Sequence, residues 1–507
     1  MIKIIDCGSQ LTQNIARRIR ELGVFTEILP FHSSSNAIKS NDLEGIIISG
    51  GQFSVYDEGS PEYTREVFEM GVPILGICYG QQSIAYMFGG KVKPTENREY
   101  GKTIVKIKKE SSLFKNIPDR EFNVWMSHGD IVENVPSGFD IIALSENGHI
   151  ASMQKGNIYA VQFHPEVDHT KYGRSILNNF IEICEAKRTW DPEKDYNRLV
   201  TDTKERLDGK VGIGGISGGV DSSTVSVLIG KLVGKHYHPI FVDNGLLRLN
   251  ETKEVKEKLN PFDLNVHYVD ASERFLFKLR GIVNPDKKRK IIGHEFINIF
   301  EEEARKIKGA SYLVQGTLYP DVIESVPVYG ASSKIKRHHN VGGLPEKMNL
   351  EVVEPFKHMF KDEVRKIAEH KLGMPKEIIF RHPFPGPGLA IRIVKSDVTL
   401  KKLNILRKAD SIFIEEIKNR GLYYKISQAF AGLFNSQSTG VMGDGGTYES
   451  MIGLRAVVTD DFMTADWYDF NKEDLTAITN RIVNEVKGVN NVAYFTTQKP
   501  PATIEWE

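Results

Sequence analysis

Ser217-Gly218-Gly219-Val220-Asp221-Ser222-Ser223 is the stretch from which the organisation of this chain can be worked out. It follows an apolar, glycine-rich run at residues 211–216, which predicts a buried strand, and precedes a helical apolar pattern at 224–232. A strand, a glycine turn and a helix start direct backbone N–H groups and the positive helix end toward one point. The glycines allow close approach and the serines add donors, so a phosphate group is the expected ligand.

Asp221 is unexpected in an anion-binding loop unless a divalent cation binds there too, which favours a Mg²⁺-bound polyphosphate and Asp221 as metal ligand. The alternative is a glycine-rich turn without a ligand. The spacing differs from G-x-x-x-x-G-K-S/T and from G-x-G-x-x-G. It resembles the pyrophosphate loop of the ATP pyrophosphatases, which adenylate a carbonyl oxygen. The resemblance implies ATP binding by Ser217, Gly218, Gly219, Val220, Asp221, Ser222 and Ser223.

The overall composition is that of a globular protein with two to four domains, since the chain has 507 residues, 40% hydrophobic and 26% charged. Lys+Arg and Asp+Glu both number 66, so we expect neither nucleic acid nor a membrane as partner. The N-terminus lacks the features of a secretory signal. Three cysteines cannot form a disulfide framework, and we therefore expect a cytoplasmic protein.

Strand and helix patterns divide the chain into three predicted domains. Residues 1–188 and 189–385 each show the alternation of a doubly wound α/β domain with a mostly parallel sheet. The densest proline and glycine cluster, residues 381–388, marks a boundary near residue 385. The remaining residues, 386–507, predict a small α+β domain that serves in dimerisation and begins with a strand at 389–394.

A candidate nucleophile follows a predicted strand in the first domain, where Gly76 and Gly80 flank Cys78 at the start of a helix. The glycines permit the sharp turn of a nucleophile elbow, and a helix N-terminus stabilises the thiolate. The alternative for Cys78 is a small buried side chain, which is what we expect of Cys7 and Cys184.

The base and its orienting group are expected at Gln162-Phe163-His164-Pro165-Glu166, directly after a predicted strand at 158–163. Pro165 favours an extended conformation for His164, so the side chains of His164 and Glu166 point the same way. Glu166 can fix the tautomer of His164, and His164 can accept the proton of Cys78. An isolated His-x-Glu is commonly a surface feature, and it is the elbow that makes this pair a triad candidate.

These motifs resemble those of class I glutamine amidotransferases. The resemblance implies that Cys78, His164 and Glu166 are catalytic. It also implies glutamine binding at Gln82 and an oxyanion hole formed by backbone N–H groups near Gly51 and Tyr79. The chain differs from the family in having Gln52-Phe53 after the Gly-Gly pair, where proline is common. Residues 125–130 resemble a segment near the amino-acid end of the substrate, with a capped loop as the alternative.

The rest of the chain resembles the synthetase part of the GMP synthases in the segments 243–248, 288–290 and 338–345. The ending Lys499-Pro500-Pro501-Ala502-Thr503-Ile504-Glu505-Trp506-Glu507 is also similar to that family, and its aromatic residue predicts docking rather than fraying. The resemblance implies a lid at 338–343. It further implies XMP binding by Arg289, Gln428, Lys499 and Glu505.

The resemblance covers essentially the whole chain and implies a ligase of guanine nucleotide biosynthesis. Its substrates would be glutamine, XMP and ATP as co-substrate, with Mg²⁺, and its assembly a homodimer. ATP would be cleaved to AMP and pyrophosphate through an adenylated XMP, which ammonia from glutamine converts to GMP. One alternative is another adenylating amidotransferase, such as an NAD synthetase. The other is a nucleotide sensor without catalysis on the same scaffold.

Overall fold

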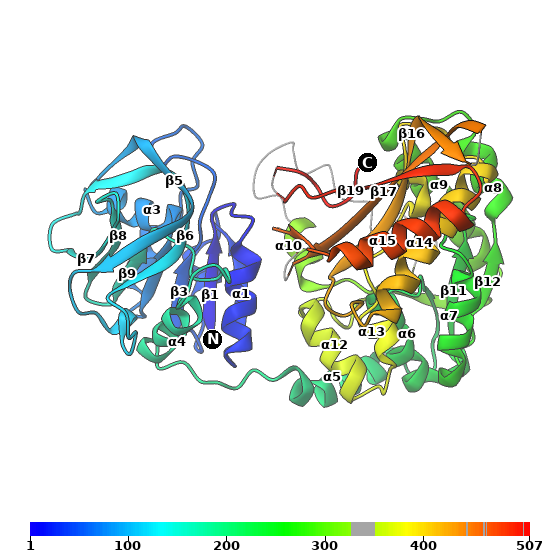
Figure 1. Ribbon diagram of the computed structural model, residues 1–507. Coiled ribbons are helices and arrows are strands. Elements are labelled where there is room, and N and C mark those ends of the chain that lie inside the picture. Colours follow the sequence, from blue (N-terminus) through cyan, green and yellow to red (C-terminus); the bar gives the residue numbers. More distant parts are fainter. Residues whose placement is uncertain (326–349, 443–444, 460–461, 463, 500) are drawn as a thin grey trace. The chain divides into compact units, whose positions relative to one another are not determined.

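The computed structural model describes residues 1–325, 350–442, 445–459, 462, 464–499 and 501–507 (Figure 1). They form two compact units, an N-terminal unit, Met1–Asp191, and a C-terminal unit that contains Pro192–Val322 and residues 350–507. The predicted lid at 338–343 lies outside the described residues. No helix in the described ranges is both long enough and apolar enough to cross a membrane.

The N-terminal unit contains a nine-stranded sheet in the order β2-β1-β3-β4-β9-β8-β7-β5-β6. Five strands pair in parallel, as predicted: β1 (Ile2–Asp6), β2 (Thr26–Pro30), β3 (Gly45–Ile48), β4 (Ile74–Ile77) and β9 (Ile158–Val161). Four strands extend the sheet in antiparallel fashion: β5 (Lys91–Ile107), β6 (Glu121–Asn134), β7 (Asp140–Ser145) and β8 (Ile150–Lys155). The strand patterns above did not include this extension.

Helices cover both faces of the parallel part of this sheet. Ile46 and Ile48 of β3 share a core with Ile84 of α3 (Tyr79–Met87). Gly45 faces the opposite side, and a methyl group there would lie 2.4 Å from Sγ of Cys184, directly after α4 (Gly173–Ile183). Helix α1 (Thr12–Glu21) contacts α4. This arrangement confirms a doubly wound α/β fold.

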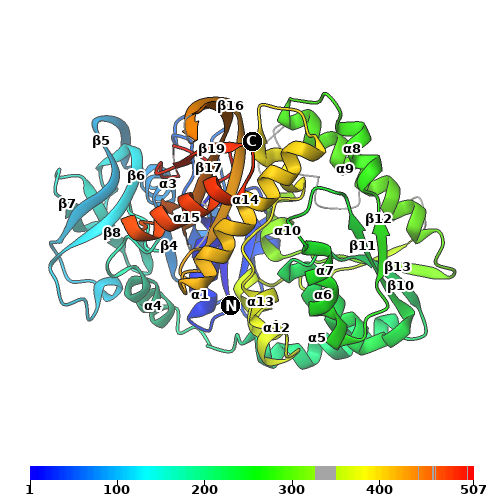
Figure 2. The ribbon, with the colours of Figure 1, turned by 45° about the vertical axis from the view of Figure 1, so that its right-hand side comes forward.

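The C-terminal unit contains a fully parallel sheet in the order β12-β11-β10-β13-β14. Its strands β10 to β13 are labelled in Figure 2. Its strands are β10 (Val211–Gly215), β11 (Tyr237–Asp243), β12 (His267–Asp270), β13 (Ala310–Val314) and β14 (Glu351–Val353). From β10 the chain adds β11 and β12 on one side, and later adds β13 and β14 on the other side. The strand order therefore reverses at the carboxyl end of β10, where ligands of such sheets bind.

Alternating side chains of this sheet face two cores. Val242 packs with residues of α8 (Ser272–Leu279) and α9 (Pro285–Ala304). The neighbouring Phe241 packs with residues of five helices on the other face. These are α5 (Pro192–Leu207), α6 (Val220–Val233), α7 (Glu251–Leu259), α12 (Lys361–His370) and α13 (Lys376–Ile379). Helices on both faces confirm the second doubly wound sheet.

A smaller mixed sheet completes the C-terminal unit. Its strands are β15 (Ile393–Val394), β16 (Gln428–Met442), β17 (Gly445–Val458), β18 (Asp466–Trp467) and β19 (Val489–Tyr494). Helices α14 (Leu400–Asn419) and α15 (Lys472–Glu485) contact each other and this sheet (Figure 1). One core runs from Ile213 of β10 to Ile482 of α15, so the boundary near residue 385 stays a prediction.

The strand predicted at 389–394 is wrong over most of its length. Gly388–Arg392 forms a 3-10 helix, and only Ile393–Val394 pairs as a strand. Gly388 has φ +63°, and a methyl group there would lie 2.5 Å from the carbonyl oxygen of Leu246. The chain must therefore turn tightly against the loop after β11, which the apolar composition of the segment did not reveal.

Candidate active sites

The predicted nucleophile elbow lies between β4 and α3. Cys78 has φ +54° and ψ −106°, a strained conformation for a residue with a side chain. Methyl groups at Gly76 and Gly80 would lie 2.6 Å from Cδ1 of Ile84 and 2.4 Å from the carbonyl oxygen of Ile48. Strand and helix approach each other too closely for any other residue, and the turn presents Sγ of Cys78 at the carboxyl edge of the sheet.

His164 and Glu166 follow β9, the strand next to β4, and meet Cys78 there. Nδ1 of His164 donates a hydrogen bond of 2.7 Å to Oε1 of Glu166, and both side chains are buried. Burial by itself lowers the pKa of His164, but the charges of Glu166 and Cys78 and their hydrogen bonds raise it well above its ordinary value. The imidazolium form of His164 is therefore favoured.

The predicted oxyanion residues, Gly51 and Tyr79, lie against each other next to Cys78. A methyl group at Gly51 would lie 2.7 Å from the carbonyl oxygen of Cys7 and 3.3 Å from Cγ of Tyr79. One at Gly50 would lie 3.4 Å from Cε1 of His164. Tyr79 is the first residue of α3, and the first N–H groups of a helix have no partner within it. The loops after β3, β4 and β9, which are neighbours in the sheet, thus form one site.

Gln82 and the segment 125–130 also belong to this site. Nε2 of Gln82 donates hydrogen bonds to the carbonyl oxygen of Asp130, at 3.0 Å, and to Oε1 of Gln162, at 3.3 Å. The capped loop considered for 125–130 is wrong, since these residues lie within β6. Nε2 of Gln162 lies 3.7 Å from Sγ of Cys78, a contact that the sequence patterns did not identify.

The loop in which the chain departs from the amidotransferase pattern is held by side chains. Ser54 Oγ and Tyr56 Oη both donate to the carboxylate of Asp130, the latter at 2.9 Å. The backbone N–H of Ser54 donates to Oδ2 of Asp57 at 3.0 Å. Gln52-Phe53 therefore stands in a loop with defined contacts although the usual proline is missing.

The other two cysteines lie in the core, as expected. Both are buried in the described structure. Burial, together with the neighbouring charge of Asp6, raises the pKa of the Cys7 thiol, and burial likewise raises the pKa of Cys184. Neither thiol is therefore suited to act as a nucleophile at neutral pH.

We expect replacement of Glu166 by Gln to change the pH dependence of glutamine hydrolysis. Without the carboxylate the pKa of His164 falls, because the largest contribution that raises it is removed. The imidazolium then loses its proton at a lower pH, so the alkaline limb of the pH–rate profile moves toward acid. We expect the rate at neutral pH to fall about 100-fold.

Glutaminase pH–rate profiles of the wild type, Glu166→Gln and Glu166→Asp check this expectation. Glu166→Asp keeps the negative charge and should keep the alkaline limb nearer its wild-type position. An unchanged alkaline limb in Glu166→Gln would contradict the assignment of Glu166 as the partner of His164.

The second site is the phosphate loop, residues 217–223, at the carboxyl end of β10. Oγ of Ser222 lies 3.0 Å from Oγ of Ser217 and accepts a hydrogen bond of 3.1 Å from the backbone N–H of Ser217. Gly316, just after β13, lies against it, since a methyl group there would be 3.3 Å from the carbonyl carbon of Asp221. The ends of β10 and β13 therefore converge at the point where the strand order reverses.

At the third predicted strand end, the carboxylate of Asp243 is occupied by local hydrogen bonds. Its carboxylate accepts hydrogen bonds from Oγ1 of Thr252, at 2.6 Å, and from the backbone N–H of Gly245, at 2.9 Å. Asp243 thus shapes the turn into α7. In the described structure this local role takes up both of its oxygens.

The carboxylate of Asp221 is paired through only one of its two oxygens within the described part of the chain. Oδ1 is buried and has no hydrogen-bond partner among the described residues, whereas Oδ2 lies 3.3 Å from Nζ of Lys361. A carboxylate oxygen left without a donor beside a phosphate-binding loop fits a hard cation such as Mg²⁺. Lys361 begins α12, far from the loop in sequence, and no local pattern distinguishes it from the other lysines.

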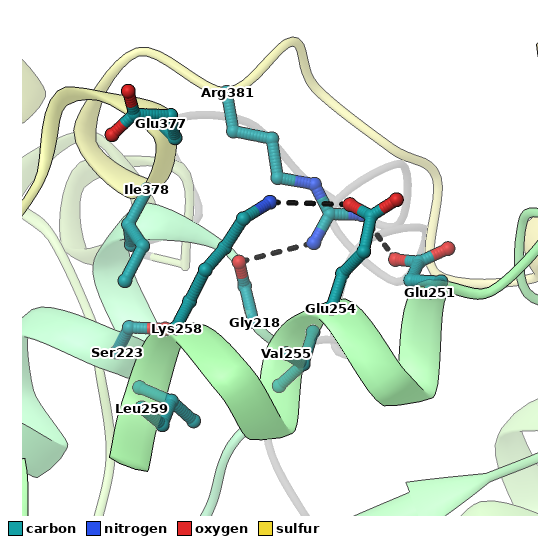
Figure 3. A pocket seen from close by; sticks show the side chains of 10 residues that line it. All are labelled: Gly218, Ser223, Glu251, Glu254, Val255, Lys258, Leu259, Glu377, Ile378 and Arg381. Atoms are coloured by element: carbon teal, nitrogen blue, oxygen red, sulfur yellow. Dashed lines mark hydrogen bonds and ion pairs between the residues drawn. The ribbon is translucent and has the colours of Figure 1, made fainter. Parts of the chain in front are cut away.

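Behind the loop, Ser223 and Gly218 line a small hollow together with residues of α7 and Arg381 (Figure 3). Ser223 is fully buried, and its Oγ has no partner in the part of the chain that the structure describes. The hydroxyl groups of Ser217 and Ser222 therefore lie on the open side of the loop, and that of Ser223 lies at the rear.

The predicted XMP-binding residues are only partly brought together. Nε2 of Gln428 donates a hydrogen bond of 2.8 Å to Oε1 of Glu505. Nζ of Lys499 donates to the carbonyl oxygen of Phe462 at 2.6 Å, and Arg289 pairs with Asp286 on its own helix at 3.3 Å. Over the described ranges no hydrogen bond or ion pair joins Arg289 or Lys499 to the Gln428–Glu505 pair.

The C-terminal tail docks on the small sheet, as predicted. The ring of Trp506 lies 4.9 to 5.2 Å from those of Phe430, Phe434 and Phe495. Each of the two flanking glutamates meets a buried cation: Nη2 of Arg392 lies 2.8 Å from Glu505, and Nζ of Lys288 lies 3.0 Å from Glu507. These two cations support the tail, and the sequence patterns did not identify that role.

Comparisons with known proteins identify the family of the chain. The family described as glutamine amidotransferase class-I matches residues 3–184, and the GMP synthase C-terminal domain family matches residues 415–506. The glutamine-hydrolyzing GMP synthases of Brachyspira hyodysenteriae and Aquifex aeolicus are each 51% identical to the chain, and that of Chlorobium luteolum is 49% identical. All three alignments cover 100% of this chain and 99% of the relative. The chain belongs to the family of glutamine-hydrolyzing GMP synthases.

Proposed function

We propose that the protein converts XMP to GMP with ammonia taken from glutamine, while ATP is cleaved to AMP and pyrophosphate. The observation that carries this proposal is the presence of two different sites in one chain. One has a strained cysteine beside a His–Glu pair, and the other has a glycine-rich loop with a partnerless carboxylate oxygen at a strand-order reversal. The first suits acyl transfer and the second suits polyphosphate chemistry.

In the first site, the thiolate of Cys78 attacks the amide carbon of glutamine. The backbone N–H groups of Gly51 and Tyr79 stabilise the oxyanion that forms, which is commonly the largest electrostatic contribution to acyl transfer. His164, oriented by Glu166, gives its proton to the departing ammonia and then accepts one from the water that hydrolyses the thioester. Gln82 contributes to binding of glutamine.

In the second site, the phosphate loop holds the β- and γ-phosphates of ATP while the XMP carbonyl oxygen attacks the α-phosphorus. Lys361 contributes a positive charge beside Asp221. Mg²⁺, held by Asp221, would neutralise charge on the pyrophosphate. Ammonia then displaces AMP from the adenylated carbon, and GMP results. Arg289, Gln428, Lys499 and Glu505 are proposed to bind XMP.

We further propose three domains at 1–188, 189–385 and 386–507, a homodimer, a cytoplasmic location and no nucleic-acid partner. The mass of the protein in solution, measured by light scattering, tests the homodimer directly. A monomer at micromolar concentration would refute it.

The decisive experiment measures AMP, pyrophosphate and GMP formed from ATP, Mg²⁺, XMP and glutamine. We expect all three products in equal amounts. Nicotinic acid adenine dinucleotide in place of XMP should yield none, and a product with that acceptor would favour an NAD synthetase. Binding of ATP and XMP without any product would favour the nucleotide sensor.

A further inference from the structure

Arg381 holds the phosphate loop from behind, and no step described above uses it (Figure 3). It follows α13 (Lys376–Ile379) and begins the proline- and glycine-rich cluster 381–388. Only 15% of its side chain is exposed. The hollow beside it has a volume of about 10 Å³, which leaves room for at most one water molecule. The role of Arg381 therefore depends on its contacts with the protein.

The guanidinium group of Arg381 has two partners. Nη1 donates a hydrogen bond of 3.1 Å to the carbonyl oxygen of Gly218, and Nη2 forms an ion pair with Oε1 of Glu251. Glu251 is the first residue of α7, and its Oε2 accepts a hydrogen bond of 2.8 Å from the backbone N–H of Arg248. Glu251 is buried. Its carboxylate and the carbonyl oxygen of Gly218 together hold the planar guanidinium group in a defined direction.

Gly218 itself is shaped by this contact. It has φ +75°, and a methyl group there would lie 2.5 Å from Cγ2 of Val255 and 3.2 Å from Nη1 of Arg381. The left-handed conformation and the close approach both require glycine. The rear of the loop is therefore pressed against α7 and Arg381.

The contact also sets the direction of the next N–H group. In a trans peptide the carbonyl and the following N–H point in opposite directions. Because Arg381 binds the carbonyl of Gly218 at the rear, the N–H of Gly219 points to the front, where it lies 3.4 Å from Oγ of Ser217. If this peptide rotated, its carbonyl oxygen would face the phosphates and repel them.

We propose that Arg381, held by Glu251, is a positioning residue that orients the Gly218–Gly219 peptide so that the phosphate loop donates N–H groups to the pyrophosphate part of ATP. This inference rests on the proposed function, in which the loop binds that part of the nucleotide. The adenosine part of ATP makes no use of this peptide. Arg381 should therefore affect recognition of pyrophosphate and leave recognition of AMP unchanged.

The test compares pyrophosphate and AMP as separate ligands. Affinities are measured by calorimetry with Mg²⁺ for the wild type, Arg381→Ala, Arg381→Lys and Glu251→Gln, together with pyrophosphate release driven by XMP and ammonium. For Arg381→Ala we expect pyrophosphate affinity and release rate to fall about 10- to 100-fold. AMP affinity and glutaminase activity should stay at the wild-type level. Arg381→Lys should be intermediate, because a lysine cannot bind both partners in one plane.

Lys258→Ala is the matched control. Lys258 lines the same hollow and pairs with Glu254 at 3.2 Å, so its removal changes the charge there while the contact of Arg381 with Gly218 remains. We expect wild-type affinities for both ligands from this variant.

Several outcomes would overturn the proposal. Wild-type pyrophosphate affinity in Arg381→Ala would do so, and so would equal losses for pyrophosphate and AMP, which indicate a general structural role. If Arg381→Ala does not fold, Arg381→Lys and Glu251→Gln serve as the test. Unchanged pyrophosphate affinity in both variants would then refute the proposal. Failure of the wild type to release pyrophosphate would instead refute the proposed function.

Discussion

Cys78→Ala should lower glutamine-dependent GMP formation by at least about 10⁴-fold and leave the ammonium-dependent reaction within about twofold of the wild type. The variant lacks the atom that attacks the amide, while His164 and Glu166 remain in place. Replacement of this buried side chain by alanine removes only one sulfur, and the elbow is imposed by the close approaches at Gly76 and Gly80. The second site does not contain this residue. Glutamate release and GMP formation, each measured with glutamine and with ammonium, check the expectation.

Cys184→Ala is the matched control for this experiment, since Cys184 is also a buried free thiol, located at the end of α4. We expect wild-type rates with both nitrogen sources. Glutamine hydrolysis that persists in Cys78→Ala would remove Cys78 from the mechanism. Loss of the ammonium-dependent reaction in the same variant would contradict the independence of the two sites.

Asp221→Asn should impair the second site and leave the glutaminase site intact, the reverse of what we expect for Cys78→Ala. We expect GMP formation with either nitrogen source to fall about 100- to 1,000-fold, because the variant loses the charge that faces both Lys361 and the proposed cation. Hydrolysis of glutamine itself should continue. The Mg²⁺ concentration for half-maximal pyrophosphate binding should rise, which is a readout independent of turnover.

Asp263→Asn provides the control, because Asp263 is an exposed aspartate of the same unit that pairs with Lys235 at 2.8 Å. Asn also tolerates its left-handed backbone, φ +47°. We expect no change in ATP cleavage or Mg²⁺ dependence. Wild-type ATP cleavage by Asp221→Asn would show that the partnerless oxygen is not a metal ligand.

The chemistry-bearing loops could be predicted from sequence because each is a local feature. A buried strand, a glycine turn and a helix start lie within a few residues of one another at Cys78 and at Ser217–Ser223. The His164–Glu166 pair likewise depends on the extended conformation before one proline. Such geometry follows from short-range sterics and helix termini, which the neighbouring residues specify.

The antiparallel strands β5 to β8 were not predicted, because their pairing depends on residues that are distant in sequence. In β5 and β6 polar or charged residues alternate with buried ones, so one face of β5 is exposed over much of its length. An exposed, lysine-rich strand has no continuous apolar run, and its pairing partners are distant in sequence. The 3-10 helix Gly388–Arg392 was also not predicted, because its turn is imposed by a group distant in sequence, the carbonyl oxygen of Leu246.

By itself the sequence determined the α/β class, the positions of the thiol and of the phosphate loop, and the burial of the other two cysteines. Only the tertiary structure decided which side chains serve those loops. Lys361 beside Asp221, Arg381 behind Gly218 and Arg392 beneath Glu505 each reach their partner from more than one hundred residues away. A lone lysine or arginine carries no local signal, because its role depends on the charge and carbonyl groups that folding brings within hydrogen-bond distance.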